Sequence, residues 1–317
     1  MSTRVRGLTI VTCKETSSHW QRWPDVYEIF RWAAKIVPKL PRGLRQNLAV
    51  VIGTLGWLSA RRRRECVTAN VTQVLGASVP HTLFGFMQTQ RIVRRVFCNC
   101  IRNYLDLLAL PAVTRQEIVA NLDVKGVENL EAALALGRGV VLFSAHLGPF
   151  EYLPAWFSAR GYRMVIPVEK LRDERLLHLM VDLRRRNGAD FVPLDGPKAI
   201  RTMYDALSNN HVVLITADRA VAGESVVTDF FGTPARLPQG PVDLSLRSGA
   251  PLVGAFGWRS AGGRMAAEFT PLTLALPPDQ SDKREVLQAA LTRQLEKIVR
   301  AHLDEWVVFE PIWAQHN

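Results

Sequence analysis

The sequence predicts an α/β fold in which helices flank a mostly parallel central sheet, preceded by a helical N-terminal region. From about residue 121 onward, short apolar runs of strand type alternate with helical segments. The first hundred or so residues instead place apolar side chains at helical spacing. With 317 residues, of which 48% are hydrophobic, the chain can bury a sizeable core. We expect one continuous domain made of a helical, membrane-proximal part, residues 1–115, and an α/β core, residues 116–317.

The clearest helix of the N-terminal part is predicted over residues 83–110. This stretch has no proline, its apolar residues recur near helical spacing, and Pro111 ends it. Two earlier helical segments are separated by Pro38 and Pro41.

An apolar run at residues 48–60 is followed at once by four arginines, residues 61–64. The run is shorter than the ~20 residues that a membrane-spanning helix needs. A short apolar helix beside a basic cluster suits a lipid headgroup interface. The same pattern also fits a buried core helix with a solvated arginine end. Both interpretations remain open, and the interfacial one predicts that residues 42–64 hold the protein on a membrane.

The α/β part is predicted to contain two fully buried strands. The runs at 139–145 and 211–217 are continuously apolar, which is typical of strands covered on both faces of a parallel sheet. Other strands are expected at 122–126, 163–168, 189–194, 226–231, 251–258 and 264–270, and helices at 127–136, 150–160, 172–187, 197–208 and 282–303.

The formal net charge is +11, and most of the positive charge is arginine. Such a balance indicates an anionic partner: a phospholipid surface, a nucleic acid or an acidic carrier protein. No secretory signal is evident near the N-terminus. The basic residues are scattered through all segments and form no known nucleic-acid-reading module. We therefore expect a lipid surface rather than nucleic acid.

The cysteine and histidine spacings predict neither a disulfide framework nor a metal site. Cys13, Cys66, Cys98 and Cys100 form no paired CxxC motif, so we expect reduced thiols. The histidines are not clustered at metal-ligand spacing, and no phosphate-loop or dinucleotide fingerprint is present.

The segment at residues 144–151, SAHLGPFE, directly follows a buried strand. Catalytic groups of α/β sheets lie at the carboxyl ends of strands, where His146 stands. Pro149 suits the first turn of a helix, so Glu151 should lie early in that helix and fold back toward the imidazole. A carboxylate on one ring nitrogen fixes the tautomer and raises the basicity of the other. The free nitrogen would then take a proton from an alcohol that attacks a thioester.

The spacing of His146 and Glu151 alone is a weak signal, and a structural histidine explains it equally well. Ser144 lies close by but lacks the Gly-x-Ser-x-Gly elbow of a nucleophilic serine. We therefore do not expect an acyl-serine intermediate.

A second strand end carries Asp218 and Arg219. Arg219 is expected to hold a phosphate or a developing oxyanion, and Asp218 to orient it or the acceptor. The alternative is an exposed turn. For the other candidates, two interpretations are also open: Arg236 and Arg247 either contact a phosphate or lie on the surface. Phe230 and Phe231 either border an acyl groove or pack in the core. One of Arg184, Arg185 and Arg186 either faces the cleft or lies, like the others, at a helix end or on the surface.

Several segments resemble the bacterial lipid A late acyltransferases. This family includes the phosphatidylinositol mannoside acyltransferases and shares the His-x4-Asp/Glu motif with glycerolipid acyltransferases. The likeness is weak at residues 66–76 and 102–111. It is clear in KGVENLEAALALGRGVVLFSAHLGPFEYLP at 125–154 and LRRRNGADFVPLDG at 183–196, and continues through residues 212–256 to EWVVFEPIW at 305–313. Many relatives have Asn-Trp before the acidic residue, where this chain has Pro149 and Phe150, so the acceptor stays open.

The resemblance implies a glycerolipid-acyltransferase-like fold and an O-acyltransferase of lipid biosynthesis. Acyl-CoA or acyl carrier protein would donate a fatty acyl group to a hydroxyl of a membrane lipid or glycolipid, with no permanently bound cofactor. His146 would be the base and Glu151 its charge-relay partner. The cleft would be lined by Asp218 and Arg219 and by the segment that contains Phe230 and Phe231. From the helical region near 42–64 and the basic patches, we expect a peripheral location on the anionic cytoplasmic face of the inner membrane.

Two other functions remain possible from the sequence. A thioesterase or lipase would use the same histidine with water and would differ only in what its acceptor site excludes. A basic nucleic-acid-binding protein would account for the net charge of +11.

Overall fold

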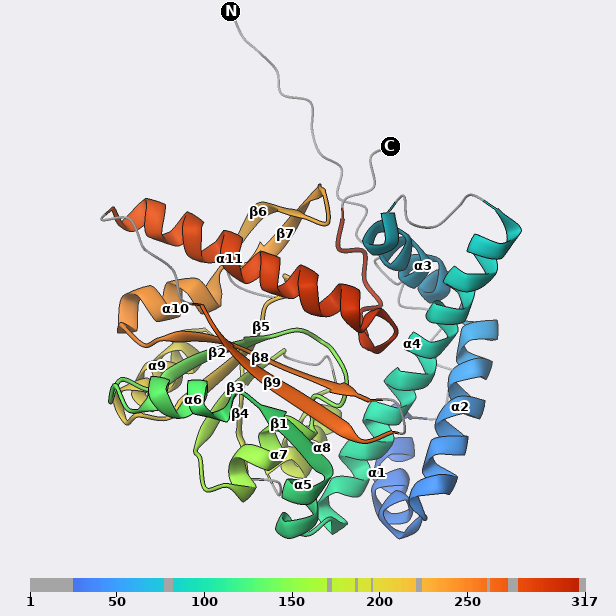
Figure 1. Cartoon of the computed structure of the whole chain (residues 1–317). Helices are drawn as coiled ribbons and strands as arrows, with labels where there is room; N and C mark the ends of the chain where they lie inside the picture. Colours follow the sequence, from blue (N-terminus) through green and yellow to red (C-terminus); the bar gives the residue numbers. More distant parts are fainter. Residues whose placement is uncertain are drawn as a thin grey trace, which may run out of the picture.

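The computed structural model has a central sheet with helices on both faces (Figure 1). It describes residues 25–76, 82–169, 173–185, 188–194, 196–220, 224–260, 263–272 and 279–313. Three parts of the sequence discussed above lie outside these residues: Cys13, Arg186 and the N-terminal segment that was searched for a secretory signal. The predicted fold class is confirmed.

The main sheet has seven strands in the order β1-β9-β8-β2-β5-β3-β4. Neighbouring strands are parallel, except that β8 and β9 are antiparallel. Its strands are β1 Leu122–Lys125, β2 Val140–Ser144, β3 Met164–Val168, β4 Asp190–Pro193, β5 Val212–Thr216, β8 Leu252–Arg259 and β9 Met265–Pro271. The two strands predicted to be fully buried, β2 and β5, lie side by side at its centre.

A separate two-stranded antiparallel ribbon joins β6 Ser225–Phe230 to β7 Thr233–Pro238. The sequence pattern predicted the first strand but not the second. The reason is that β7 contains Pro234 and Pro238, and proline is disfavoured within paired strands. The ribbon accommodates both prolines because each of its strands pairs with only one other strand.

Strand β2 shows why the apolar run is continuous. Val140 and Leu142 join one hydrophobic cluster, while Val141 and Phe143 join another, and all four are fully buried. Alternate side chains thus face opposite helical layers. The first layer contains α5 Arg115–Asn121, α6 Val127–Leu134 and α7 Tyr152–Ala159, and the second contains α9 Pro197–Ser208, α10 Gly240–Ser248 and α11 Gln280–Ala301.

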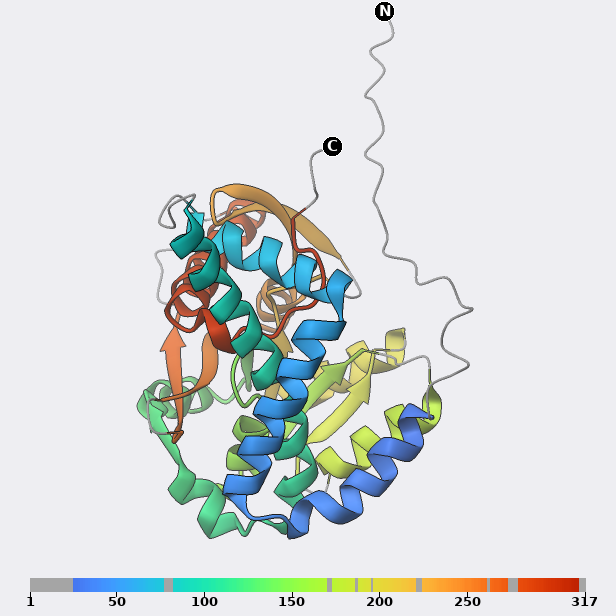
Figure 2. The same cartoon turned by 90° about the vertical axis from the view of Figure 1, so that its right-hand side faces the viewer.

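The N-terminal helices cover one side of the molecule, which faces the viewer in Figure 2. They are α1 Val26–Ile36, α2 Arg42–Ser59, α3 Arg61–Leu75 and α4 Leu83–Ala109. The last of these matches the helix predicted over residues 83–110. Val71 of α3 and Val96 of α4 belong to the same hydrophobic cluster as the sheet residue Phe143. None of the described helices is both long and apolar enough to cross a bilayer.

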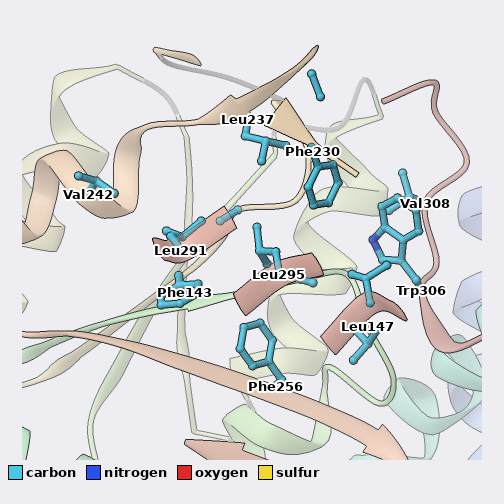
Figure 3. Packing of buried hydrophobic residues seen from close by; sticks show 14 of the residues in the cluster. Phe143, Leu147, Phe230, Leu237, Val242, Phe256, Leu291, Leu295, Trp306 and Val308 are labelled. Atoms are coloured by element: carbon cyan, nitrogen blue, oxygen red, sulfur yellow. The ribbon is translucent and has the colours of Figure 1, made fainter. Parts of the chain in front are cut away.

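After α11 the chain forms a segment that we name the C-terminal strap, residues 303–313. Its Trp306 lies beside Phe230 and Leu147 in the core shown in Figure 3. The indole nitrogen of Trp313 donates a 2.9 Å hydrogen bond to the carbonyl oxygen of Phe230. Asn70 of α3 donates a 2.8 Å hydrogen bond to the carbonyl oxygen of Glu310. The strap is therefore fixed by α3 on one side and by β6 on the other.

Helices α2 and α4 approach each other closely at Gly53. A Cβ atom there would lie 2.5 Å from the Cα atom of Cys98, so the α4 backbone would have to move. At Gly56, three residues later on the same helix, a Cβ atom would lie 3.5 Å from the Phe97 ring, an ordinary contact.

These two glycines give a matched test of the contact between α2 and α4. Gly53→Ala should lower the melting temperature, because overpacking costs about 1–3 kcal/mol. Gly56→Ala should keep or raise it, because alanine is about 1 kcal/mol better than glycine inside a helix. Thermal unfolding followed by circular dichroism measures both. Equal stability of the two variants would contradict the close approach.

Candidate active site

His146 follows β2 in a turn that brings its main chain against the C-terminal strap. Gly148 has a φ of 60°, and a Cβ atom there would collide with the backbone of Gly257 and Trp258. The carbonyl oxygen of His146 accepts a 2.8 Å hydrogen bond from the amide of Val307. The amide of Gly148 donates a 3.0 Å bond to the carbonyl oxygen of Glu305. The histidine loop is thus held at a fixed position.

Asp218 follows β5, and its carboxylate is completely buried. Its Oδ1 atom lies 2.8 Å from Nδ1 of His146. Its Oδ2 atom accepts hydrogen bonds from the main-chain amide of His146 at 2.9 Å and from the indole of Trp306 at 2.8 Å. One carboxylate therefore connects the ends of two strands and the C-terminal strap.

The pKa of Asp218 is below its usual value of 3.8. Burial alone would raise this pKa, but the charge and hydrogen bonds of His146 and the hydrogen bond from Trp306 lower it. The group is therefore ionised at neutral pH, and its contribution to stability is lost only as the pH falls through the lowered pKa. Because an ionised carboxylate only accepts hydrogen bonds, Nδ1 of His146 is the nitrogen that donates to Asp218.

The expected contact between Glu151 and His146 is wrong: the carboxylate on the imidazole belongs to Asp218. Ser144 and Thr216 are paired at the ends of β2 and β5, so the residues two positions later on each chain segment meet. The pattern of two apolar strands, each followed by polar side chains, contained this signal. It did not show that the two strands are neighbours.

Glu151 lies just before α7, with its carboxylate 5% exposed. It accepts hydrogen bonds from Arg184 of α8 (Glu174–Arg185), at 2.6 Å from Nη2 and at 2.9 and 3.1 Å from Nε. Of the positions considered for Arg184, the helix end is the one found, because Arg184 lies in the last turn of α8, and its side chain is only 20% exposed. Its guanidinium lies 5.1 Å from the ring centre of Phe191. This pair joins the start of α7 to the end of α8.

A pocket of about 200 Å³ opens beside His146. Its walls come from three parts of the chain: the strand ends, α4 and the C-terminal strap. They are formed by His146, Phe150 and Arg219, by Cys100, Asn103 and Tyr104, and by Val307, Val308, Phe309 and Glu310. The residues of α4 and of the strap were not predicted as site residues, because nothing in their local pattern differs from that of core segments. A larger hollow of about 370 Å³ lies near Arg138 and Tyr204, at the amino ends of the strands and away from this chemistry.

Arg219 lines the pocket, but its guanidinium is already paired. Nη1 lies 2.6 Å from Glu310 and Nη2 lies 3.1 Å from Glu169. Burial lowers the pKa of Arg219, but these carboxylates outweigh that effect and raise it. Both partners are well exposed, with side-chain exposures of 61% for Glu310 and 49% for Glu169. They can therefore turn to water when another anion takes their place.

The remaining predicted residues do not line this pocket. Phe230 is fully buried, and its ring stacks 5.6 Å from that of Trp313. Phe231 packs against the same tryptophan, with ring centres 6.2 Å apart. Arg236 on β7 and Arg247 on α10 are exposed. The structure thus brings His146, Asp218 and Arg219 together and leaves these four residues, like Glu151, outside.

The pocket wall contains a thiol and a phenol that stay protonated. Burial raises the pKa of Cys100 to about 12. Burial also raises the pKa of Tyr104. Because the thiolate is the nucleophilic form, Cys100 is a poor nucleophile at neutral pH. Among the residues that the structure describes, no cluster of three or more His, Cys, Asp or Glu side chains could hold a metal ion.

Comparison with known proteins extends over the strand ends, the pocket and the strap. A family model described as bacterial lipid A biosynthesis acyltransferase matches residues 12–315. A phosphatidylinositol mannoside acyltransferase of Mycobacterium tuberculosis (strain ATCC 25618 / H37Rv) is 30% identical over 260 residues, covering 78% of this chain and 77% of the relative. A protein with the same description from Mycolicibacterium smegmatis is 26% identical over 285 residues, covering 88% of each. The resemblance found in the sequence is confirmed, and the chain belongs to the bacterial lipid A biosynthesis acyltransferase family.

Proposed function

We propose that this protein transfers a fatty acyl group from an acyl thioester to a hydroxyl of a membrane glycolipid, with His146 as the general base and Asp218 as its carboxylate partner. The observation that carries the proposal is the 2.8 Å hydrogen bond between Nδ1 of His146 and the fully buried Asp218, at the edge of a pocket. Family membership supports the reaction class. Acyl-CoA or acyl carrier protein is the donor in this proposal.

In the proposed step, Nε2 of His146 takes the proton of the acceptor hydroxyl. The hydroxyl oxygen attacks the carbonyl carbon of the thioester at the same time. The carbonyl electron pair moves onto oxygen, and the C–O bond forms. When the tetrahedral intermediate collapses, the C–S bond breaks and His146 returns the proton to the leaving sulfur. The products are an ester and a free thiol. General-base catalysis of this kind contributes roughly 10²–10⁴-fold.

Transfer is direct in this proposal, without an acyl-enzyme. The pocket offers one thiol, Cys100, and its pKa of about 12 keeps it protonated. Ser144 is 9% exposed, and its hydroxyl bonds to the adjacent carbonyl of Ala145. Donor and acceptor must therefore be bound at the same time.

The acceptor is proposed to be a phosphate-bearing glycolipid. The relatives described as phosphatidylinositol mannoside acyltransferases support this class. Arg219 is the pocket cation that would meet the phosphate, after Glu169 and Glu310 turn away. Arginine binds phosphate in a bidentate manner. Arg236 and Arg247 do not line the pocket and have no part in the proposal.

The protein is proposed to lie on the cytoplasmic face of the inner membrane, held by its N-terminal helices. Arg64 caps the end of α2 through the carbonyl oxygen of Leu58 at 3.0 Å, while Arg61, Arg62 and Arg63 stay exposed beside it. Such basic residues attract an anionic lipid surface. Large apolar side chains that are at least 48% exposed lie on these helices and at the start of α4: Ile29, Trp32 and Ile36; Val51, Leu55 and Leu58; Leu83, Phe84, Phe86 and Met87.

Asp218→Asn should lower kcat by roughly 10⁴-fold, because the amide disfavours the tautomer in which Nε2 is the base. His146→Ala should lower it by at least ~10²–10⁴-fold. Initial rates with an acyl thioester and a glycolipid acceptor measure both, with circular dichroism to confirm folding. A folded His146→Ala protein with a transfer rate near that of wild type would contradict the proposed mechanism. Release of free fatty acid at the full rate without any acceptor would indicate a thioesterase instead.

Glu151 should act through Arg184 and not through His146. Glu151→Gln leaves a buried arginine unpaired, which typically costs about 3–5 kcal/mol of stability. Replacing Arg184 with Met as well removes the unpaired charge, so the double variant should regain most of the lost melting temperature and much of the transfer rate. If Glu151 were the relay partner, the double variant would stay as inactive as the single one while regaining stability.

Membrane binding is tested with one exposed leucine. Leu55→Asp should weaken co-sedimentation with anionic phosphatidylglycerol vesicles at least ~10-fold, because burying a leucine is worth about 1.5–3 kcal/mol. Ile200→Asp on α9 is the matched control, since Ile200 is 52% exposed and Leu55 is 59% exposed. The control should bind like wild type. Equal loss in both variants would argue against a membrane face on α2.

A further inference from the structure

Asn103 of α4 has a buried hydrogen-bond donor without a partner. The residue is 3% exposed and forms part of the wall of the pocket beside His146. Its Nδ2 atom is shielded from water and has no hydrogen-bond partner among the described residues. Buried donors are rarely left unpaired, because the cost of removing them from water is not recovered. A ligand oxygen in the pocket would supply the missing acceptor.

The orientation of this amide is fixed by Arg259. Oδ1 of Asn103 accepts a 2.7 Å hydrogen bond from Nη2 of Arg259, and a guanidinium can only donate. The amide therefore cannot be turned over. Arg259 is itself 5% exposed and is held at 2.7 Å by Asp106 and at 2.9 Å by Glu305. Its hydrogen bond to Oδ1 polarises the amide and makes Nδ2 a stronger donor.

The main-chain amides around the base are already occupied. The amide of His146 donates to Asp218, that of Leu147 to the carbonyl of Ala145 at 2.7 Å, and that of Gly148 to the carbonyl of Glu305. A tetrahedral intermediate formed beside His146 would carry a negative oxygen. The amides of residues 146–148 have no hydrogen left for it.

We propose that Nδ2 of Asn103 donates a hydrogen bond to the carbonyl oxygen of the acyl thioester and stabilises the oxyanion formed when the acceptor hydroxyl attacks. This inference rests on the proposed acyl transfer and assigns the group that receives the developing charge. The electron pair of the C=O bond moves onto the oxygen that Nδ2 contacts, and it returns when the C–S bond breaks. Preorganised donors of this kind are worth most in the transition state.

The test uses Asn103→Asp and Asn103→Ala. Asn103→Asp keeps the shape and the acceptor for Arg259 but replaces the donor with an oxygen. Asn103→Ala removes the donor without adding charge. Loss of one oxyanion donor typically lowers kcat by about 10²–10³-fold, and KM for the acceptor should change little. Both variants should also lose affinity for an acyl-CoA analogue whose carbonyl group is retained as a ketone, and keep affinity for a thioether analogue without a carbonyl.

Asn99→Asp is the matched control, one turn earlier on α4. Asn99 is 5% exposed, accepts a 2.9 Å hydrogen bond from Arg102 and donates one of 2.8 Å to the carbonyl of Asp304, but it does not line the pocket. The Asn99→Asp variant should have a lower melting temperature than wild type and an unchanged kcat.

The outcomes separate this inference from the proposed function. If wild type shows no transfer, or if transfer survives His146→Ala, the proposed function is wrong and so is the proposed role of Asn103. If transfer depends on His146, and either Asn103 variant folds and keeps kcat within threefold of wild type, only the role of Asn103 is overturned. Equal loss of kcat in Asn99→Asp, or equal loss of affinity for both analogues, also overturns it in favour of a structural role.

Discussion

The hydrogen-bonded carboxylate of Asp218 is the constraint on which the rest of the site depends. An ionised carboxylate is very costly to bury unless it is paired and hydrogen-bonded. Here the imidazole and the main-chain amide of His146 and the indole of Trp306 supply the partners. Each of these groups lies where it does because β2, β5 and the C-terminal strap converge on one point. The hydrogen bonds that orient His146 are therefore also contacts that hold the strap against the two strand ends.

A second buried network extends this arrangement to α4. Arg259 at the end of β8 binds Asp106 and Asn103 of α4 and Glu305 of the strap. Burial raises the pKa of Glu305, and the guanidinium of Arg259 opposes that effect. The removal of one partner from such a network leaves a buried charge uncompensated. Helix, sheet and strap are thus fixed relative to one another directly beside the pocket.

The sequence predicted those parts of the molecule that local pattern determines. The apolar runs of β2 and β5 and the position of His146 at a strand end were visible, because burial on both faces leaves a continuous hydrophobic signature. The partner of His146 was not visible, since strand order is a property of the folded sheet. Glu151 was assigned to the histidine by its nearness in sequence and by the His-x4-Asp/Glu motif of the family it resembles, whereas α8 places Arg184 against it. Asn103 and the strap enter the pocket from positions more than 40 residues before His146 and more than 150 after it, a convergence that no local pattern encodes.

The place of Trp306 in the chain also bears on biosynthesis. His146, Asp218 and Arg259 are all translated before the strap, yet the indole that completes the hydrogen bonding of Asp218 comes only at residue 306. A nascent chain that has not passed this point has its strands but lacks the donor and the backbone pairing that hold the histidine loop. The hydrogen bonding around His146 and Asp218 can therefore be completed only late in synthesis, once the strap has been made.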